Sequence, residues 1–258
     1  MGDEHRGDQV SKSLAGKKIL VTGASSGIGE ATARLLASEG AAVVVHYGQR
    51  RDAAEKLVAE IAGAGGVAVA IGADLLELDQ RSTLVARSIE ALGGLDGLVN
   101  NAGRIVKPTP VLELTLEGWR DAFALNAEAP FFLAQQAFAH MQAHGGGRII
   151  NISSIGVKFG GSPTSLHYSS AKQALEGVTT GLAKAGAPVN VLVNAIRPGV
   201  IDTPIHSHQD PENMKRRVAM IPLKRFGTSE EIARMIAFLI GPGGDFITGQ
   251  IFAVSGGE

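Results

Sequence analysis

An apolar run leads directly into a glycine-rich turn in the stretch Ile19-Leu20-Val21-Thr22-Gly23-Ala24-Ser25-Ser26-Gly27-Ile28-Gly29. The apolar run predicts a buried strand, and a helix is expected over Ile28–Ser38. Glycines permit a tight bend and a close backbone approach, and the amides that open a helix attract a phosphate group. The spacing is longer than G-x-G-x-x-G. The stretch therefore predicts a nucleotide site, against the alternative of a turn that binds nothing.

Short apolar runs and amphipathic segments alternate from this turn to the end of the chain. Fully apolar strands separated by helices indicate a parallel sheet that is buried on both faces. Right-handed crossovers then give a doubly wound, Rossmann-type α/β sheet of about seven strands, which binds ligands beyond the C-terminal ends of its strands. The expected strands are Ile19–Val21, Val43–Val45, Val67–Ile71, Leu95–Val99, Arg148–Ile152, Val189–Ala195 and Gln250–Val254, and the further helices are Asp52–Ala62, Asp79–Leu92, Leu116–Ala143, Tyr168–Ala185 and Ser229–Ile240.

Length and composition fit one globular catalytic domain. The chain has 258 residues, of which 45% are hydrophobic and 19% are charged. A doubly wound fold of ~250 residues is commonly a single unit. We expect a flexible tail at 1–13, a single dinucleotide-binding domain at 14–258 and a substrate lid at about 204–226.

Several function classes are disfavoured by composition. The formal net charge of −1 provides no basic field for nucleic acid. The chain has no cysteine, no apolar run long enough to span a membrane and a polar N-terminus without the core of a signal peptide, so a cytoplasmic location is expected. His206 and His208 have no third ligand at a suitable spacing, so no metal site is predicted.

Two residues stand four apart at Tyr168 and Lys172, shortly after Ser153 and Ser154. On a helix, residues at i and i+4 share one face. A lysine ammonium near a phenol favours the phenolate and lowers a pKa that starts near ~10. The pair would then donate or accept a proton closer to neutral pH. Because Tyr-x-x-x-Lys is a permissive pattern, its weight depends on the other motifs.

The end of the second strand bears on the choice of cofactor. It reads His46-Tyr47-Gly48-Gln49-Arg50-Arg51, with no acid before Asp52. An acidic residue there would bind the adenine ribose and repel a 2′-phosphate, whereas arginines pair with that phosphate. The pattern favours NADP(H) over NAD(H), against the alternative that Arg50 and Arg51 only solvate the start of a helix.

These motifs occur in the order typical of one family. Over about residues 17–257, the chain resembles the single-domain short-chain dehydrogenases/reductases, and it is most similar to the 3-oxoacyl-[acyl-carrier-protein] reductase-type members. Besides the glycine-rich turn, the resemblance rests on Asp74-Leu75, Asn100-Asn101-Ala102-Gly103, Asn126, Ser154, Tyr168 with Lys172, and Arg197-Pro198-Gly199 through Thr203-Pro204.

The resemblance implies four catalytic residues. Tyr168 would be the general acid in reduction and the general base in oxidation, and Lys172 would lower its pKa and bind the nicotinamide ribose. Ser154 would donate a hydrogen bond to the substrate oxygen. Asn126 would kink its helix and anchor a water that resupplies the proton through Lys172.

The resemblance also implies a cofactor site. Asp74 would accept a hydrogen bond from the adenine amino group, with Leu75 beside the ring. Asn101-Ala102-Gly103 would hold the fourth strand against the cofactor, and the segment from Pro198 to Thr203 would surround the nicotinamide carboxamide. The expected cofactor residues are Gly23, Ser25, Ser26, Gly27, Ile28, Gly29, Tyr47, Gln49, Arg50, Asp74, Leu75, Asn101, Ala102, Gly103, Tyr168, Lys172, Pro198, Gly199, Ile201 and Thr203.

One departure from the family pattern leaves the serine open. The family commonly places this serine thirteen residues before the tyrosine, where this chain has Ile155. Aligning the preceding strand favours Ser154, with one extra residue in the loop 156–167. Ser153 is the alternative.

The implied function is an NADP(H)-dependent oxidoreductase that interconverts a ketone or aldehyde and an alcohol, as in the reduction of a 3-oxoacyl group on its carrier protein. A sugar, polyol or other secondary-alcohol dehydrogenase is the alternative. A non-catalytic NADP-binding sensor or scaffold would be expected to lose Tyr168 or Lys172. The resemblance also implies a homo-oligomer, a tetramer or a dimer, that packs through helices near Trp119–Met141 and Tyr168–Ala185.

Overall fold

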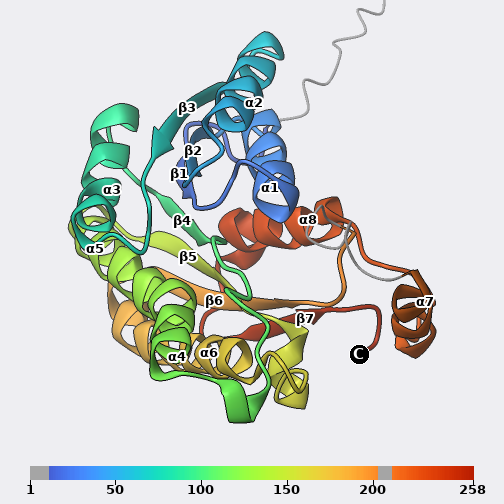
Figure 1. The fold of residues 1–258 in the computed structure, drawn as a ribbon. Coiled ribbons are helices and arrows are strands. Elements are labelled where there is room, and N and C mark those ends of the chain that lie inside the picture. Colours follow the sequence, from blue (N-terminus) through green and yellow to red (C-terminus); the bar gives the residue numbers. More distant parts are fainter. Residues whose placement is uncertain (1–11, 203–210) are drawn as a thin grey trace, which may run out of the picture.

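The computed structural model describes residues 12–202 and 211–258. Its sheet has seven strands in the order β3-β2-β1-β4-β5-β6-β7, and every neighbouring pair is parallel, which confirms the predicted Rossmann-type α/β class (Figure 1). The strands are β1 (Lys18–Val21), β2 (Ala42–Tyr47), β3 (Val67–Gly72), β4 (Gly97–Asn100), β5 (Gly147–Ile152), β6 (Val191–Pro198) and β7 (Ile251–Val254). The α-helices are α1 (Gly27–Ser38), α2 (Arg51–Gly63), α3 (Leu78–Leu92), α4 (Leu116–Phe123), α5 (Ala129–Ala143), α6 (Leu166–Gly186), α7 (Pro211–Met220) and α8 (Ser229–Ile240).

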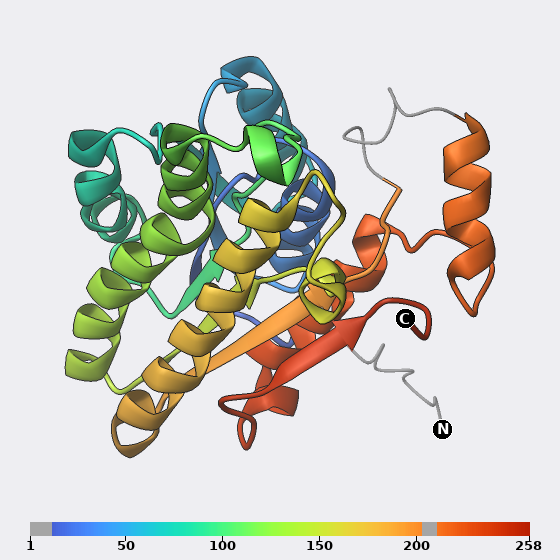
Figure 2. The same ribbon diagram turned by 60° about the horizontal axis from the view of Figure 1, so that its bottom comes forward.

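Helices cover both faces of the sheet. Figures 1 and 2 show α1, α2 and α8 on one side and α3, α4, α5 and α6 on the other, while α7 lies apart from both layers. The helices α1 and α8 pack on each other, as do α3 and α5. This arrangement leaves the C-terminal edge of the sheet as the place where the predicted motifs meet.

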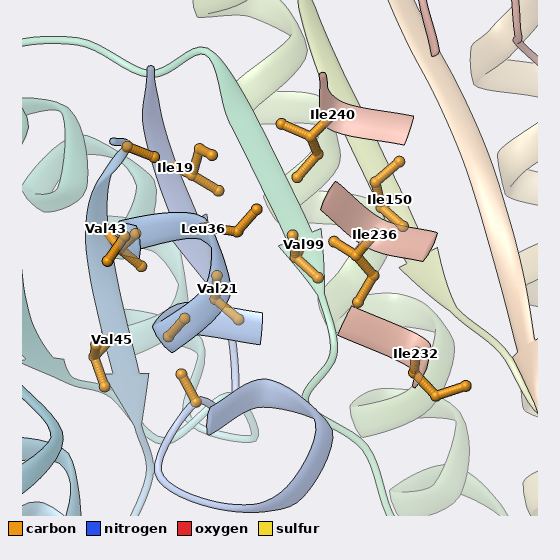
Figure 3. Close-up of a cluster of buried hydrophobic side chains, with 14 of the residues drawn as sticks. Ile19, Val21, Leu36, Val43, Val45, Val99, Ile150, Ile232, Ile236 and Ile240 are labelled. Atoms are coloured by element: carbon orange, nitrogen blue, oxygen red, sulfur yellow. The ribbon is translucent and has the colours of Figure 1, made fainter. Parts of the chain in front are cut away.

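Alternating side chains of the central strands form the two cores. Ile19 and Val21 point to the α1/α8 side (Figure 3). Leu20 belongs to the core on the opposite side. Val21 is in register with Val45 of β2 and Val99 of β4, so the three side chains line up across the sheet. Complete burial of such a side chain contributes about 1.5–3 kcal/mol, which fixes the register of β1 and thus the position of the turn that follows it.

Most bounds shift by one or two residues, and two of the expected elements differ more from the structure. The strand expected over Val189–Ala195 is β6, Val191–Pro198, because a 3₁₀ turn ends at Asn190 with the left-handed φ of 57°. The helix expected over Leu116–Ala143 contains a π-helical segment, Ala124–Glu128, between α4 and α5. Pro130 has no amide hydrogen for the carbonyl of Asn126, so a regular α-helix cannot continue through this point.

Candidate active site

The glycine-rich turn after β1 leaves no room for side chains. Gly23 and Gly27 have positive φ angles of 63° and 57°. A Cβ atom on Gly29 would lie 2.4 Å from the Gly23 carbonyl oxygen and 2.5 Å from Nδ2 of Asn101. Helix α1 begins here with Ser26 in an extended conformation and without a side-chain cap. The first amides of α1 are therefore available to an anionic group, and the predicted turn residues from Gly23 to Gly29 form one compact cradle.

A buried histidine holds this turn in place. Nδ1 of His46 accepts a hydrogen bond from the Gly23 amide at 3.0 Å, and Nε2 lies 2.9 Å from the carbonyl oxygen of Ala73. This pattern fixes the neutral tautomer with the proton on Nε2. Burial lowers the pKa of His46 to about 4, with a further lowering by Arg87 and opposing effects of the Ala73 carbonyl and Asp74. His46 was not among the predicted site residues, and the sequence offered only its position at the end of a strand.

We expect His46 to make stability depend on pH. Its folded pKa of about 4 lies below the ordinary value of 6.5, so the unfolded chain takes up the proton first and stability is lost as the pH falls from 6.5 towards 4. Between pH 7 and pH 5 this corresponds to about 2 kcal/mol. Urea unfolding of the wild type and of His46→Asn at both pH values measures the difference, and an equal pH dependence in the two proteins would contradict it.

The end of β4 is tied to the end of β1. Nδ2 of Asn101 donates to the carbonyl oxygens of Thr22 and Gly23 at 2.8 and 3.2 Å, and the Thr22 hydroxyl accepts from the amides of Asn101 and Ala102. A Cβ atom on Gly23 would meet Ala102 at 3.0 Å. Small residues thus bring the two strand ends together beneath the cradle.

The residues predicted for adenine lie after β3. Oδ1 of Asp74 accepts a hydrogen bond from the amide of Leu76 at 3.0 Å, so this carboxylate shapes its own turn and has its second oxygen free of a described partner. Leu75 is only 4% exposed and belongs to the hydrophobic core. Its side chain packs inward, and its place beside an adenine ring stays a prediction.

The loop after β2 carries the two arginines. Arg51 is paired with Glu55 at 2.7 Å on α2, whereas the exposed side chain of Arg50 has no hydrogen-bond or ion-pair partner among the described residues. Gln49 is also exposed, and the Tyr47 ring packs against Gly72. Arg50 is the arginine that remains available to a phosphate.

The structure separates the two candidate serines. Ser154 follows β5, and its hydroxyl lies near enough to the Tyr168 phenol to lower the pKa of that phenol. The Ser153 hydroxyl is buried and donates to Oε1 of Glu176 at 2.6 Å. Of the two, the serine brought to the tyrosine is Ser154, as the alignment of the strand favoured.

Burial has the largest effect on the pKa values of Tyr168 and Lys172. Burial raises the pKa of Tyr168, and the hydrogen bond with Ser154 works in the opposite direction. The Lys172 ammonium donates to the carbonyl oxygen of Ile152 at 2.7 Å and lies 5.9 Å from the centroid of the Tyr168 ring. Burial lowers the pKa of Lys172 itself to about 8. Lys172 is thus desolvated and directed to the backbone in this structure, and its lowering of the pKa of Tyr168 stays a prediction.

The π-helical segment brings Asn126 beside this pair. Its buried side chain donates to the carbonyl oxygens of Arg104 and Ala122 at 3.0 Å and accepts from the Arg104 amide at 3.1 Å. A Cβ atom on Gly103 would lie 2.8 Å from Oδ1 of Asn126 and 2.9 Å from Nζ of Lys172. Gly103, Asn126 and Lys172 are therefore neighbours, as the motif order implied.

The loop after β6 closes the other side of the candidate site. A Cβ atom on Gly199 would lie 2.7 Å from Cα of Ser255, and Ile201 is buried and bridged to Gly227. Pro198 ends β6. Thr203, His206 and His208 lie outside the described residues, as does part of the expected lid.

Two further features of the described residues concern membrane spans and metal sites. None of the helices in 12–202 and 211–258 combines the length and the apolar character needed to cross a membrane. The same part of the chain contains no cluster of three or more acidic, histidine or cysteine side chains placed to bind a metal.

Comparisons with known proteins cover nearly the whole chain. The sequence profile described as enoyl-(acyl carrier protein) reductase matches residues 23–258. The 3-oxoacyl-[acyl-carrier-protein] reductase of Synechocystis sp. is 40% identical over 245 residues, which cover 95% of this chain and 97% of the relative.

Solved structures agree closely in fold. A 7α-hydroxysteroid dehydrogenase complexed with NADH and 7-oxo glycochenodeoxycholic acid has a TM-score of 0.90 at 35% identity and covers 96% of each chain. A blue fluorescent protein from a metagenomic library, in complex with NADPH, has a TM-score of 0.89 at 39% identity over 95% of this chain and 98% of its own. These two relatives share the architecture, but one is complexed with NADH and the other with NADPH.

Proposed function

This chain belongs to the short-chain dehydrogenase/reductase family and is an NAD(P)-dependent oxidoreductase acting on CH–OH groups, and on that premise we propose that it is an NADPH-dependent ketone reductase. The arrangement that carries the proposal is the proximity of Ser154 to Tyr168, with the buried Lys172 one turn further along α6. The glycine-rich cradle, which side chains would fill, fits a dinucleotide.

The residues of this site divide the proton chemistry between them. The cofactor, when bound, supplies the hydride. The Ser154 hydroxyl donates a hydrogen bond that orients the substrate oxygen, and Tyr168 gives its phenolic proton to that oxygen as negative charge develops. The raised pKa of Tyr168 keeps the phenol protonated at neutral pH, as a proton donor in reduction requires. Lys172, with its pKa of about 8, remains mainly an ammonium at neutral pH and stabilises the tyrosinate that forms.

A 3-oxoacyl thioester is the proposed substrate class, since the Synechocystis relative reduces such a group according to its name. A secondary alcohol of another kind is the alternative. A panel of an acetoacetyl thioester, a diketone, an aldose and an oxo-steroid, each with NADPH and with NADH, tests both. Fastest turnover of the thioester with NADPH supports the proposal, and faster turnover of another ketone would redirect it.

Arg50 is the proposed partner of the cofactor 2′-phosphate. Its guanidinium has no described partner, and no acidic residue precedes Asp52 after β2. Arg50→Ala should weaken NADPH binding about 10-fold and leave NADH binding unchanged, because a charge-assisted contact with a phosphate is lost. Calorimetric titration measures both affinities.

Arg51→Ala is the matched control, since Arg51 is already paired with Glu55. It should change the affinity for NADPH less than Arg50→Ala does. An equal loss of NADPH and NADH binding in Arg50→Ala would indicate a structural role, and tighter binding of NADH to the wild type would contradict the proposed cofactor.

We propose a homo-oligomer that packs through α5 and α6. Gly177 and Gly181 lie on the exposed side of α6, and an added Cβ would meet nothing within 4 Å at either position. Phe132 of α5 is 39% exposed. Small residues on an exposed helix face let a second helix approach closely, and an exposed aromatic ring offers apolar area for burial. Light scattering during size-exclusion chromatography gives the number of subunits, and a monomeric mass would contradict this.

A further inference from the structure

Helix α6 contacts four consecutive residues at the end of β5 and directly after it. Three of the contacts come from one face of the helix, at the positions four residues apart that Tyr168, Lys172 and Glu176 occupy. The register between strand and helix is thus specified at every residue from 151 to 154. The pairs are Asn151 with Thr179 (2.9 Å), the carbonyl oxygen of Ile152 with Lys172 (2.7 Å), Ser153 with Glu176 (2.6 Å), and Ser154 with Tyr168.

Glu176 is the only buried acid in this row among the described residues, and both of its oxygens are engaged. Its side chain is 2% exposed. Oε1 accepts from the Ser153 hydroxyl at 2.6 Å and from Nε of Arg197 at 2.7 Å, while Oε2 accepts from Nη2 of Arg197 at 2.6 Å. A buried carboxylate needs such pairing to offset its loss of hydration, so its three hydrogen bonds act as one geometric unit.

This unit joins the three elements that carry the proposed site. The Ser153 amide also donates to the carbonyl oxygen of Ile196 at 2.7 Å, so Ser153 is held by both α6 and β6. Arg197 directly precedes Pro198, where the loop that closes the site begins. A displacement of Glu176 would therefore move Ser153 and, through the Ser153–Ser154 peptide bond, Ser154. It would also move Arg197 and, through the Arg197–Pro198 peptide bond, the closing loop.

We propose that Glu176 is a positioning residue, which acts through Ser153 and Arg197 to hold the Ser154 hydroxyl against Tyr168. The inference rests on the catalytic roles proposed for Ser154 and Tyr168. A buried ion pair is a weak source of stability and is often replaceable by apolar residues, whereas three directed hydrogen bonds restrict the orientation of the peptide that they hold. Fixing the serine is the role that this geometry suits.

The sequence contains only two tyrosines, which permits a direct test. In a Tyr47→Phe background, Tyr168 is the single tyrosine and can be labelled with the more acidic 3-fluorotyrosine. Its fluorine resonance then reports the ionisation of that phenol without cofactor or substrate. The contact with the Ser154 hydroxyl lowers the pKa of Tyr168. Ser154→Ala in this background therefore gives the pKa that Tyr168 reaches when this contact is lost.

Glu176→Gln and Ser153→Ala should each raise this pKa by about 0.5–1, towards the Ser154→Ala value. Direct electrostatics predicts the opposite sign, because removing the carboxylate leaves the charge of Arg197 and would favour the phenolate. Ser153→Thr keeps a hydroxyl and should restore the wild-type pKa. In the unlabelled enzyme, kcat should fall about 10-fold in Glu176→Gln, with a smaller change in KM.

Each result decides the proposal. A raised pKa in Ser153→Ala that Ser153→Thr reverses supports it, and an unchanged or lowered pKa overturns it. If Glu176→Gln does not fold, Ser153→Ala still decides, since it leaves the ion pair intact. If the wild type reduces no carbonyl compound, the proposed function fails while the fluorine titration still reports on the positioning.

Discussion

Tyr168→Phe should lower kcat for carbonyl reduction about 10³-fold, since the substituted ring has no proton to give. The substrate oxygen would then acquire charge next to Ser154 alone. The affinity for NADPH should change little, because the aromatic ring remains. Steady-state kinetics at saturating cofactor, together with calorimetric binding of NADPH, separates these two effects.

Tyr47→Phe is the matched control, because Tyr47 is the other tyrosine of the chain and packs on Gly72 after β2. Tyr47 is an expected cofactor residue, so the lost hydroxyl should affect NADPH affinity rather than proton transfer, and kcat at saturating cofactor should stay within a small factor. Turnover by Tyr168→Phe at the rate of this control would show that another group donates the proton, and the proposed mechanism would have to be abandoned.

Gly29→Ala should weaken NADPH binding about 100-fold. The added methyl would lie 2.4 Å from the Gly23 carbonyl oxygen and 2.5 Å from the Asn101 side chain. Both neighbours are fixed, so the turn must open, at a cost of about 1–3 kcal/mol in folding free energy. Cofactor affinity by calorimetry and the free energy of unfolding in urea measure the two consequences independently of activity.

Gly63→Ala, at the end of α2, is the control for this substitution. Its Cβ would meet nothing within 4 Å, and alanine is the better helix former. We expect unchanged NADPH binding and stability equal to or slightly above the wild type. Equal behaviour of the two alanine variants would mean that the turn adapts without cost and that the cradle is not closely packed.

The fold could be predicted because its signals are local. Three consecutive residues of β1 alternate between the two cores, and the apolar runs of the other strands repeat the pattern. The π-helical segment was harder to predict, since Leu116–Ala143 is helical in pattern throughout. Its signal was Pro130, four residues after Asn126, where the missing amide hydrogen prevents a regular helix.

The site was predicted less completely because burial and distant partners determine its chemistry. The spacing of Tyr168 and Lys172 placed both residues on α6, but it could not show that desolvation would govern the two pKa values. The role of His46 depends on Ala73, which lies 27 residues away. Glu176 pairs with an arginine 21 residues later. Such contacts exist only in three dimensions.

The link between Thr22 and Asn101 also bears on the order in which the protein folds. These residues are 79 apart in the chain, yet the Asn101 amide and side chain secure the carbonyl and hydroxyl groups of Thr22. The entropic cost of closing a loop is larger for the pairing of β1 with β4 than for the pairing of β1 with β2, which is nearer in sequence. We therefore expect β1 to pair with β4 after more local contacts have formed. A nascent chain that ends before β4 has the glycines of the cradle but lacks the Asn101 side chain, which is hydrogen-bonded to the turn. We therefore expect the capacity to hold a nucleotide to arise late in folding.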